Sequence, residues 1–157
     1  MRSRRGCRGL WLAALAFGLD RLTKALAMGT TEVFPLVPGL LDCRLTRNTG
    51  MAFSLLSDRP WLLIVLTAAL LIGLTAYLLI KPEEAPLTRA GFWLVVGGGL
   101  SNLWDRLAYG YVVDFIEPVF VRFAIFNVAD VFVCLGAGMA LVGLLMTEKL
   151  MFDEERN

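Results

Sequence analysis

The stretch Pro60–Ile80, PWLLIVLTAALLIGLTAYLLI, holds 21 residues without one charged side chain. An α-helix rises about 1.5 Å per residue, so this stretch can cross the roughly 30 Å hydrocarbon core of a bilayer. A second stretch, residues 123–147, is 25 residues long and carries one charged residue, Asp130. Length and composition therefore predict two membrane-spanning helices.

Two shorter apolar stretches lie elsewhere in the chain, one before both of these and one between them. Residues 9–19 continue as DRLTKALAM, and residues 90–104 end at Asp105 and Arg106. Both reach spanning length only if their charged residues lie near a membrane face. We predict an integral membrane, mainly α protein, in which residues 1–157 form a single membrane domain. Its core is a four-transmembrane-helix bundle, with helices at about 9–28, 60–80, 89–107 and 123–147.

The composition agrees with this class and excludes several others. Hydrophobic residues make up 57% and charged residues 18% of 157 residues, which is more apolar than a small soluble domain can bury. A net charge of +1 argues against nucleic-acid binding. The absence of histidine excludes Ser-His-Asp catalysis and histidine-ligated zinc. The cysteines, Cys7, Cys43 and Cys134, form no CxxC pair, so we interpret them as structural and expect no metal or cofactor.

The cationic residues predict the orientation. Arg2, Arg4, Arg5 and Arg8 precede the first helix, which places the N-terminus in the cytoplasm by the positive-inside rule. Four spans return the C-terminus to the same side and leave outer loops at about 29–59 and 108–122. Inner segments then carry eight Lys and Arg residues and outer segments four, namely Arg44, Arg47, Arg59 and Arg122.

The N-terminus has an alternative interpretation as a cleaved signal peptide. An apolar run follows basic residues, and Ala25, Leu26 and Ala27 match an A-x-A cleavage site. Asp20 and Lys24 interrupt the segment before that site, which favours a retained helix.

The two outer loops have different patterns. Leu41, Cys43 and Leu45 alternate with polar neighbours, which predicts a half-exposed strand, and Asn48, Thr49 and Gly50 predict a turn after it. We expect a small β-sheet on the outer face of the membrane. The loop at 108–122 is rich in aromatic and apolar residues and is predicted to lie in the membrane interface.

Polar residues embedded in the apolar stretches all fall toward the outer face. Charges inside a bilayer are costly and mark functional sites or buried pairs. Asp20 and Lys24 are spaced i, i+4 with the acid first, which favours an intrahelical ion pair. Asp105 is interpreted as a helix-end cap with its charge near the headgroups. The glycines at 97–99, 136, 138 and 143 favour close helix packing over phosphate binding, because no Walker pattern is present.

Asp114 and Asp130 are harder to explain as structure. Asp130 stands in an otherwise uncharged helix three residues after Asn127, and Asp114 is bracketed by Val112, Val113, Phe115 and Ile116. Two carboxylates close together in a dry site share one proton, which permits acid–base hydrolysis of a peptide bond without histidine. Spacing alone does not show that they meet. A small transporter and a purely structural membrane protein stay open as alternatives at this point, although the sequence shows no internal repeat.

Five motifs in order resemble one family. They are LDRLTK (residues 19–24), NTGMAFS (48–54), GGGLSNLWDR (97–106), VVDFI (112–116) and FNVAD (126–130). The sequence resembles the bacterial lipoprotein signal peptidases, or signal peptidase II, which are membrane aspartic peptidases with four helices and an outer-facing sheet. The resemblance implies an endopeptidase that removes the signal peptide from diacylglyceryl-modified prolipoproteins, cutting before the lipidated cysteine with an activated water.

The resemblance also implies roles for single residues. Asp114 and Asp130 would form the catalytic dyad. Asp20 and Lys24 would belong to the site architecture. Further residues would line the site and bind substrate: Asn48, Gly50, Asn102, Arg106 and Asn127. Two positions depart from the family pattern, Ser101 where glycine is usual and Trp104 where an aliphatic residue is usual.

The same resemblance implies a location and a set of partners. We expect a multi-pass protein of the bacterial inner membrane with its active site near the outer face. The expected partners are lipid-modified prolipoproteins and membrane lipids. Neither nucleic acid nor an obligate protein partner is expected.

Overall fold

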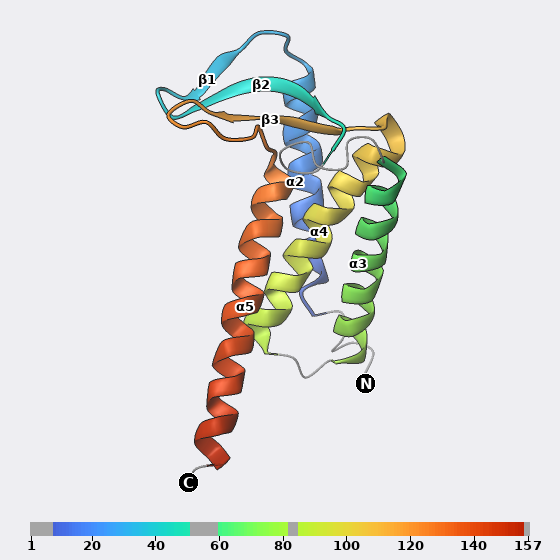
Figure 1. The fold of residues 1–157 in the computed structure, drawn as a ribbon, viewed down its shortest axis with the longest axis vertical. Coiled ribbons are helices and arrows are strands. Elements are labelled where there is room, and N and C mark those ends of the chain that lie inside the picture. Colours follow the sequence, from blue (N-terminus) through green and yellow to red (C-terminus); the bar gives the residue numbers. More distant parts are fainter. Residues whose placement is uncertain (1–7, 51–59, 82–84, 156–157) are drawn as a thin grey trace.

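The computed structural model describes residues 8–50, 60–81 and 85–155. Within these ranges, helices α2 (Leu10–Met28), α3 (Pro60–Ile80), α4 (Pro86–Tyr109) and α5 (Val128–Glu155) run side by side, and a small sheet covers one end of them (Figure 1). Helix α2 begins, and helix α5 ends, at the end away from the sheet. The protein is therefore mainly helical with a small sheet, as the sequence predicted.

The sheet has three antiparallel strands, β1 (Phe34–Val37), β2 (Leu41–Asn48) and β3 (Val112–Pro118), in the order β1-β2-β3. The strand predicted around residues 41–45 is confirmed as β2. The loop predicted at 108–122 was wrong in part, because it contains β3. Buried residues occupy consecutive positions of β3 from Val112 to Phe115, so its sequence lacks the alternation that marks a half-exposed strand.

The first residue of α5 differs from the prediction. The helix was predicted from residue 123 and begins at Val128. Phe126 instead pairs with Ile116, whose N–H and C=O both bond to its backbone at 2.8 and 3.1 Å. An apolar run is compatible with either helix or strand, and here the pairing of Phe126 with β3 leaves residues 123–127 outside the helix. At its other end α5 continues to Glu155, beyond the predicted residue 147.

Close packing centres on α4. A Cβ atom at Gly97 would collide with the backbone of Ala13 in α2, and one at Gly98 would collide with the carbonyl of Ala129 in α5. Gly136 of α5 meets α4 in the same way. The close-packing interpretation is confirmed at these three glycines. It is also confirmed at Gly99, which packs against Leu71 of α3, and at Gly143, which packs against Thr88 of α4. It is wrong at Gly138, where nothing lies within 4 Å of the added carbon. Glycine lets the backbones of α2, α4 and α5 approach one another closely.

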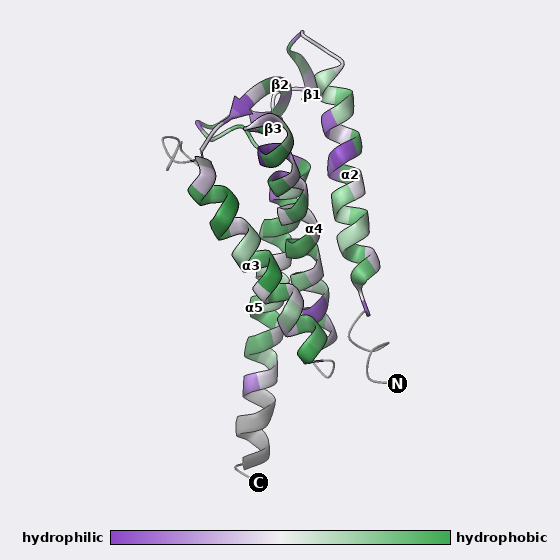
Figure 2. Cartoon of the chain, turned by 90° about the vertical axis from the view of Figure 1, so that its right-hand side faces the viewer, coloured by the Kyte–Doolittle hydropathy of each residue, from purple (hydrophilic) through white to green (hydrophobic). Residues whose placement is uncertain are grey.

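The surface of the bundle is apolar. Figure 2 shows hydrophobic residues over most of the helices and a hydrophilic segment of α2 in the half nearest the sheet. Of the described helices, α3 over Trp61–Ile80 and α5 over Val128–Glu148 are long and apolar enough to cross a membrane. Helices α2 and α4 carry charged residues that lie in the interior of the bundle, Asp20 and Lys24 in α2 and Asp105 in α4.

Candidate active site

A buried ion cluster lies between α2 and α4. The Nζ of Lys24 lies 2.8 Å from Oδ2 of Asp20 and 2.8 Å from Oδ2 of Asp105, and all three side chains are fully buried. Arg21 adds a second cation, 2.7 Å from Asp105. The intrahelical pair of Asp20 and Lys24 is therefore confirmed. The interpretation of Asp105 as a cap facing the headgroups is wrong, because its carboxylate points inward and also accepts the N–H of Val113 at 3.1 Å.

Asp20 ties three helices together. Its Oδ1 accepts the backbone N–H of Ala129 in α5 at 2.8 Å, and its Oδ2 accepts the hydroxyl of Ser101 in α4 at 2.6 Å. Ser101 is fully buried. The departure from the family's usual glycine at position 101 thus supplies a donor to a buried carboxylate. A hydrogen bond to an ionised group is stronger than a neutral one, so Ser101 reinforces the cluster.

The cluster continues toward Asp130 through Asn102. Lys24 donates to Oδ1 of Asn102 at 2.8 Å, and Nδ2 of Asn102 donates to Oδ1 of Asp130 at 2.8 Å. Because Lys24 has no acceptor atom, its contact fixes which end of the amide faces Asp130. Lys24 therefore orients the amide that binds Asp130 and does not itself contact that carboxylate through any hydrogen bond seen in the described residues.

Asn127 connects Asp130 with Asp114. Asn127 precedes the first residue of α5, and its Oδ1 accepts the N–H of Asp130 at 2.9 Å while Oδ2 of Asp130 accepts the N–H of Asn127 at 3.1 Å. This reciprocal pair is a capping box. The Nδ2 of Asn127 then donates to Oδ1 of Asp114 at 2.6 Å. One residue thus bonds to both carboxylates, which answers the question that the spacing of the sequence left open.

Asp114 lies on β3, opposite Thr46 of β2, and is 2% exposed. Its Oδ2 accepts the amide of Asn48 at 2.8 Å. Burial raises the pKa of Asp114 to about 6, and the nearby charge of Asp130 also raises it, while the bonds from Asn48 and Asn127 act in the opposite direction. The carboxyl group can therefore gain or lose a proton near neutral pH.

Both carboxylates open into one cavity of about 500 Å³, which we call the dyad cavity. Its polar lining comes from the residues named by the sequence: Asn48, Gly50, Asn102, Arg106, Asp114 and Asp130. The rest of its wall is mostly apolar and comes from Val112 of β3, from residues 123–126 and from the α5 residues Val131, Val133, Cys134 and Leu135. A substrate with apolar side chains next to its scissile peptide bond could place that bond beside both carboxylates and pack those side chains against the apolar wall of the cavity.

Arg106 approaches the dyad cavity from α4. Its Nη2 donates to the carbonyl of Gly50 at 3.0 Å, and its Nη1 lies 3.4 Å from the carbonyl of Asn102. The Nε of Arg106 is buried and has no hydrogen-bond partner among the described residues. The guanidinium group therefore links the end of β2 to α4 beside Asp130.

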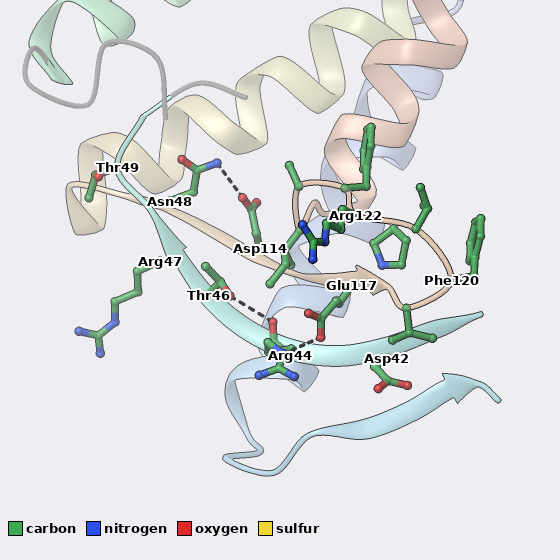
Figure 3. A pocket seen from close by; sticks show the side chains of 16 residues that line it. Asp42, Arg44, Thr46, Arg47, Asn48, Thr49, Asp114, Glu117, Phe120 and Arg122 are labelled. Carbon is green, nitrogen blue, oxygen red and sulfur yellow. Dashed lines mark hydrogen bonds and ion pairs between the residues drawn. The ribbon is translucent and has the colours of Figure 1, made fainter. Parts of the chain in front are cut away.

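A second, larger hollow of about 910 Å³ lies over β2 and β3, and we call it the strand groove. Figure 3 shows polar and charged side chains of both strands around it, with Asn48 and Asp114 joined by a hydrogen bond at one end. Asp114 and Asn48 line both the strand groove and the dyad cavity. Asp114 therefore lies where a mostly apolar cavity meets a groove that also carries charged side chains.

The remaining predictions concern cysteines and metals. Cys43 is buried beneath the sheet, Cys134 is exposed on α5, and Cys7 lies outside the described residues. No group of three or more cysteine, aspartate or glutamate residues that could hold a metal ion occurs in the described ranges.

Sequence reasoning missed the inward direction of Asp105 and the roles of Arg21 and Ser101. A signal for two of these was present, because positions 101, 102, 105 and 106 of α4 share one helical face. All four carry polar side chains in an otherwise apolar stretch. The partners of that face on α2 and α5 are far away in sequence, so only the structure could identify them.

Comparisons with known proteins agree with this geometry. The family model described as signal peptidase (SPase) II matches residues 12–146. A lipoprotein signal peptidase of Gloeobacter violaceus is 39% identical over 88% of this chain and 82% of its own length. That of Haemophilus influenzae is 34% identical over 99% of this chain and 96% of its own length.

Solved structures give the same result. A bacterial membrane enzyme of known structure superposes with a TM-score of 0.81 at 28% identity, over 88% of each chain. A second bacterial membrane enzyme gives a TM-score of 0.78 at 28% identity, over 88% of this chain and 92% of the other. These matches decide for a peptidase over the transporter and the structural protein. The chain belongs to the signal peptidase II family of bacterial membrane enzymes.

Proposed function

We propose that this chain is a prolipoprotein signal peptidase in which Asp114 and Asp130 form the catalytic pair. It removes the signal peptide from diacylglyceryl-modified prolipoproteins and cuts before the lipidated cysteine. The observation that carries the assignment is the position of the two carboxylates. Both line one cavity with an apolar wall, and both are bonded to Asn127.

The pair performs acid–base hydrolysis. One carboxylate is ionised and takes a proton from a water molecule as its oxygen attacks the scissile carbonyl carbon. The other is protonated and gives its proton to the carbonyl oxygen. When the tetrahedral intermediate collapses, the C–N bond breaks and the leaving nitrogen accepts the proton that the first carboxylate took from water. A hydroxyl group of the intermediate returns its proton to the second carboxylate as the carbonyl re-forms, which restores the starting state of the pair. The raised pKa of Asp114 supports such a shared proton near neutral pH.

The amides around the pair hold the carboxylates in place. Asn48 and Asn127 donate to Asp114, and Asn102 donates to Asp130. Each carboxylate keeps lone pairs that remain available for water or substrate. We assign Arg106 and the carbonyl of Gly50 to binding the substrate backbone, because both line the dyad cavity beside Asp130.

The same reasoning extends to the membrane. We propose that α2, α3, α4 and α5 all span the bacterial inner membrane, as one domain with both termini in the cytoplasm. Support comes from the arrangement of the helix ends, because α2 begins and α5 ends away from the sheet (Figure 1). The sheet and the active site then lie near the outer face. The charged residues of α2 and α4 are compatible with this topology, because Asp20, Lys24 and Asp105 are buried between helices and do not face lipid.

Cleavage by the purified protein in a lipid bilayer tests the proposed function. The substrate is a precursor peptide that carries diacylglyceryl on its cysteine, and mass spectrometry identifies the product. We expect a product that begins with the lipidated cysteine. A matched precursor without the lipid controls for recognition, and the Glu32→Gln variant controls for handling, since Glu32 is exposed and lines neither hollow. Cleavage at another bond, or none, would contradict the proposal.

A further inference from the structure

The strand groove and the dyad cavity meet at Asp114 and differ in character. The dyad cavity has an apolar wall formed largely by α5. The strand groove is lined by polar and charged residues of β2 and β3 and by the mostly apolar segment at residues 118–125. Apart from Asp114, its charged residues are Asp42, Arg44, Arg47, Glu117 and Arg122. A ligand that reaches across Asp114 therefore passes from a mostly apolar cavity into a groove that also offers charged groups.

A prolipoprotein changes in the same direction along its chain, from apolar residues before the scissile bond to more polar residues after it. The residues before the scissile bond belong to an apolar signal segment, and the residues after the lipidated cysteine belong to a chain that enters water. We propose that the strand groove binds the first residues of the mature lipoprotein, and that Arg122 favours acidic side chains among them. This inference rests on the proposed function and deepens it.

The register of the sheet fits this assignment. Thr46 of β2 lies opposite Asp114, and both line the strand groove next to the dyad cavity. From there the groove extends to Asp42, which pairs in register with Glu117. The six residue steps from Asn48 to Asp42 span about 20 Å of strand, which is enough for about six residues of an extended peptide.

The charges of the strand groove supply the preference. Apart from Asp114, it has three arginines against two acids, so its net charge is positive. Arg44 is engaged with Glu117 at 2.5 Å, and the guanidinium of Arg47 lies 5.3 Å from the ring centre of Tyr111. Arg122 is exposed and has no ion-pair partner in the described parts of the chain. Arg122 is thus the cation best able to pair with a substrate carboxylate.

The experiment compares lipidated precursor peptides that are identical through the cysteine. After it, four versions carry six residues with two Asp, six residues with two Lys, six neutral residues, or no residue at all. Cleavage is measured as kcat/KM in phosphatidylcholine bilayers, which carry no net charge. We expect the peptide without following residues to be cut least efficiently. We expect the Asp peptide to exceed the Lys peptide about two- to fivefold, the range of exposed charge pairs.

Two variants of Arg122 make the test specific. Arg122→Gln should bring the ratio of kcat/KM for the Asp and Lys peptides to about one, and Arg122→Glu should make the Lys peptide the better substrate. Lys81→Glu makes the same charge change on an exposed residue at the far end of the bundle and should leave the ratio as it is in the unchanged protein. Using the ratio removes any general loss of activity or folding from the comparison.

The other possible outcomes contradict either the groove assignment alone or the proposed function as well. Equal cleavage of the full and shortened peptides, or a ratio that Arg122→Glu leaves unchanged, overturns the groove assignment while cleavage itself upholds the proposed function. If the effect of Arg122→Glu follows added phosphatidylglycerol instead of peptide charge, the groove binds lipid headgroups and the assignment is again overturned. Failure of the unchanged protein to cut any of the peptides that carry following residues contradicts the proposed function and the inference together.

Discussion

Asn127 and Asp130 cap α5 reciprocally, each accepting the other's backbone N–H, at 2.9 and 3.1 Å. The Asp130 carboxylate that we assign to catalysis is therefore also part of the device that starts its helix. A negative charge at this end of a helix is stabilised by the helix dipole and by the free N–H groups of the first turn. The side-chain amide of Asn127 remains free to bond Asp114.

This arrangement allows capping and catalysis to be separated. Asn127→Ser keeps an N-cap oxygen but loses the amide that donates to Asp114, whereas Asn127→Ala loses both. We expect both variants to lose about 10- to 100-fold in kcat, because Asp114 keeps only the bond from Asn48. Both variants should lose stability through the missing bond to Asp114, and Asn127→Ala should lose about 1 kcal/mol more of unfolding free energy through the missing cap. Cleavage kinetics and thermal unfolding in detergent measure the two effects. Normal kcat in Asn127→Ser would contradict the positioning role.

Ser101 should contribute to stability without taking part in the reaction. Ser101→Ala removes the 2.6 Å bond to Asp20 and leaves a buried carboxylate oxygen with fewer donors. We expect a loss of about 1.5–3 kcal/mol in unfolding free energy, with kcat within a few-fold of normal. Thr23→Ala is the matched control, because the Thr23 hydroxyl bonds, among the described residues, only to backbone carbonyls of its own helix. A Ser101→Ala protein no less stable than Thr23→Ala would contradict this role.

Lys24 should be the most sensitive member of the ion cluster. Lys24→Met leaves the carboxylates of Asp20 and Asp105 buried with less compensating positive charge. We expect the free energy of unfolding to fall by about 3–5 kcal/mol. Arg21→Gln should lower the free energy of unfolding by clearly less, because the Arg21 side chain is 20% exposed and solvent weakens its interaction with Asp105. Thermal unfolding of the two variants under one condition checks the order. The reverse order would show that Arg21, not Lys24, is the main counter-charge.

The raised pKa of Asp114 predicts a pH-dependent difference in stability. The folded protein holds this proton up to about pH 6, whereas the unfolded chain releases it near the ordinary value of 3.8. Stability from this group is therefore fully present below about pH 4 and is lost as the pH rises through 6. Relative to the unchanged protein, Asp114→Asn should gain about 2 kcal/mol of unfolding free energy between pH 4 and pH 7.5. A stability difference that does not vary with pH over this range would contradict the prediction.

The fold was partly predictable because some signals are local. An uncharged stretch of 21 residues gives α3 with its bounds, and alternation gives β2. The strand β3 was missed, because its buried residues follow one another without alternating. The start of α5 was misplaced by five residues, although the capping pair of Asn127 and Asp130 stood at the correct place in the sequence.

The site was predictable in composition but not in its contacts. Asp114 and Asp130 could be selected because neither had an obvious structural explanation, and the family resemblance named both. Their meeting depends on β3 folding back over the start of α5, which is a tertiary event. The buried position of Asp105 likewise depends on Lys24, a residue of another helix that the glycines of α4 bring close.

The rate of cleavage by Asp114→Asn and Asp130→Asn tests the central claim most directly. Each variant should lower kcat on a diacylglyceryl-modified precursor by at least about 10³-fold, since each removes one member of a proton-transferring pair. Thermal unfolding should show that both variants remain folded, and Glu32→Gln should cut at the normal rate. A folded Asp114→Asn or Asp130→Asn protein that cleaves at the normal rate would contradict the assignment of these two carboxylates as the catalytic pair.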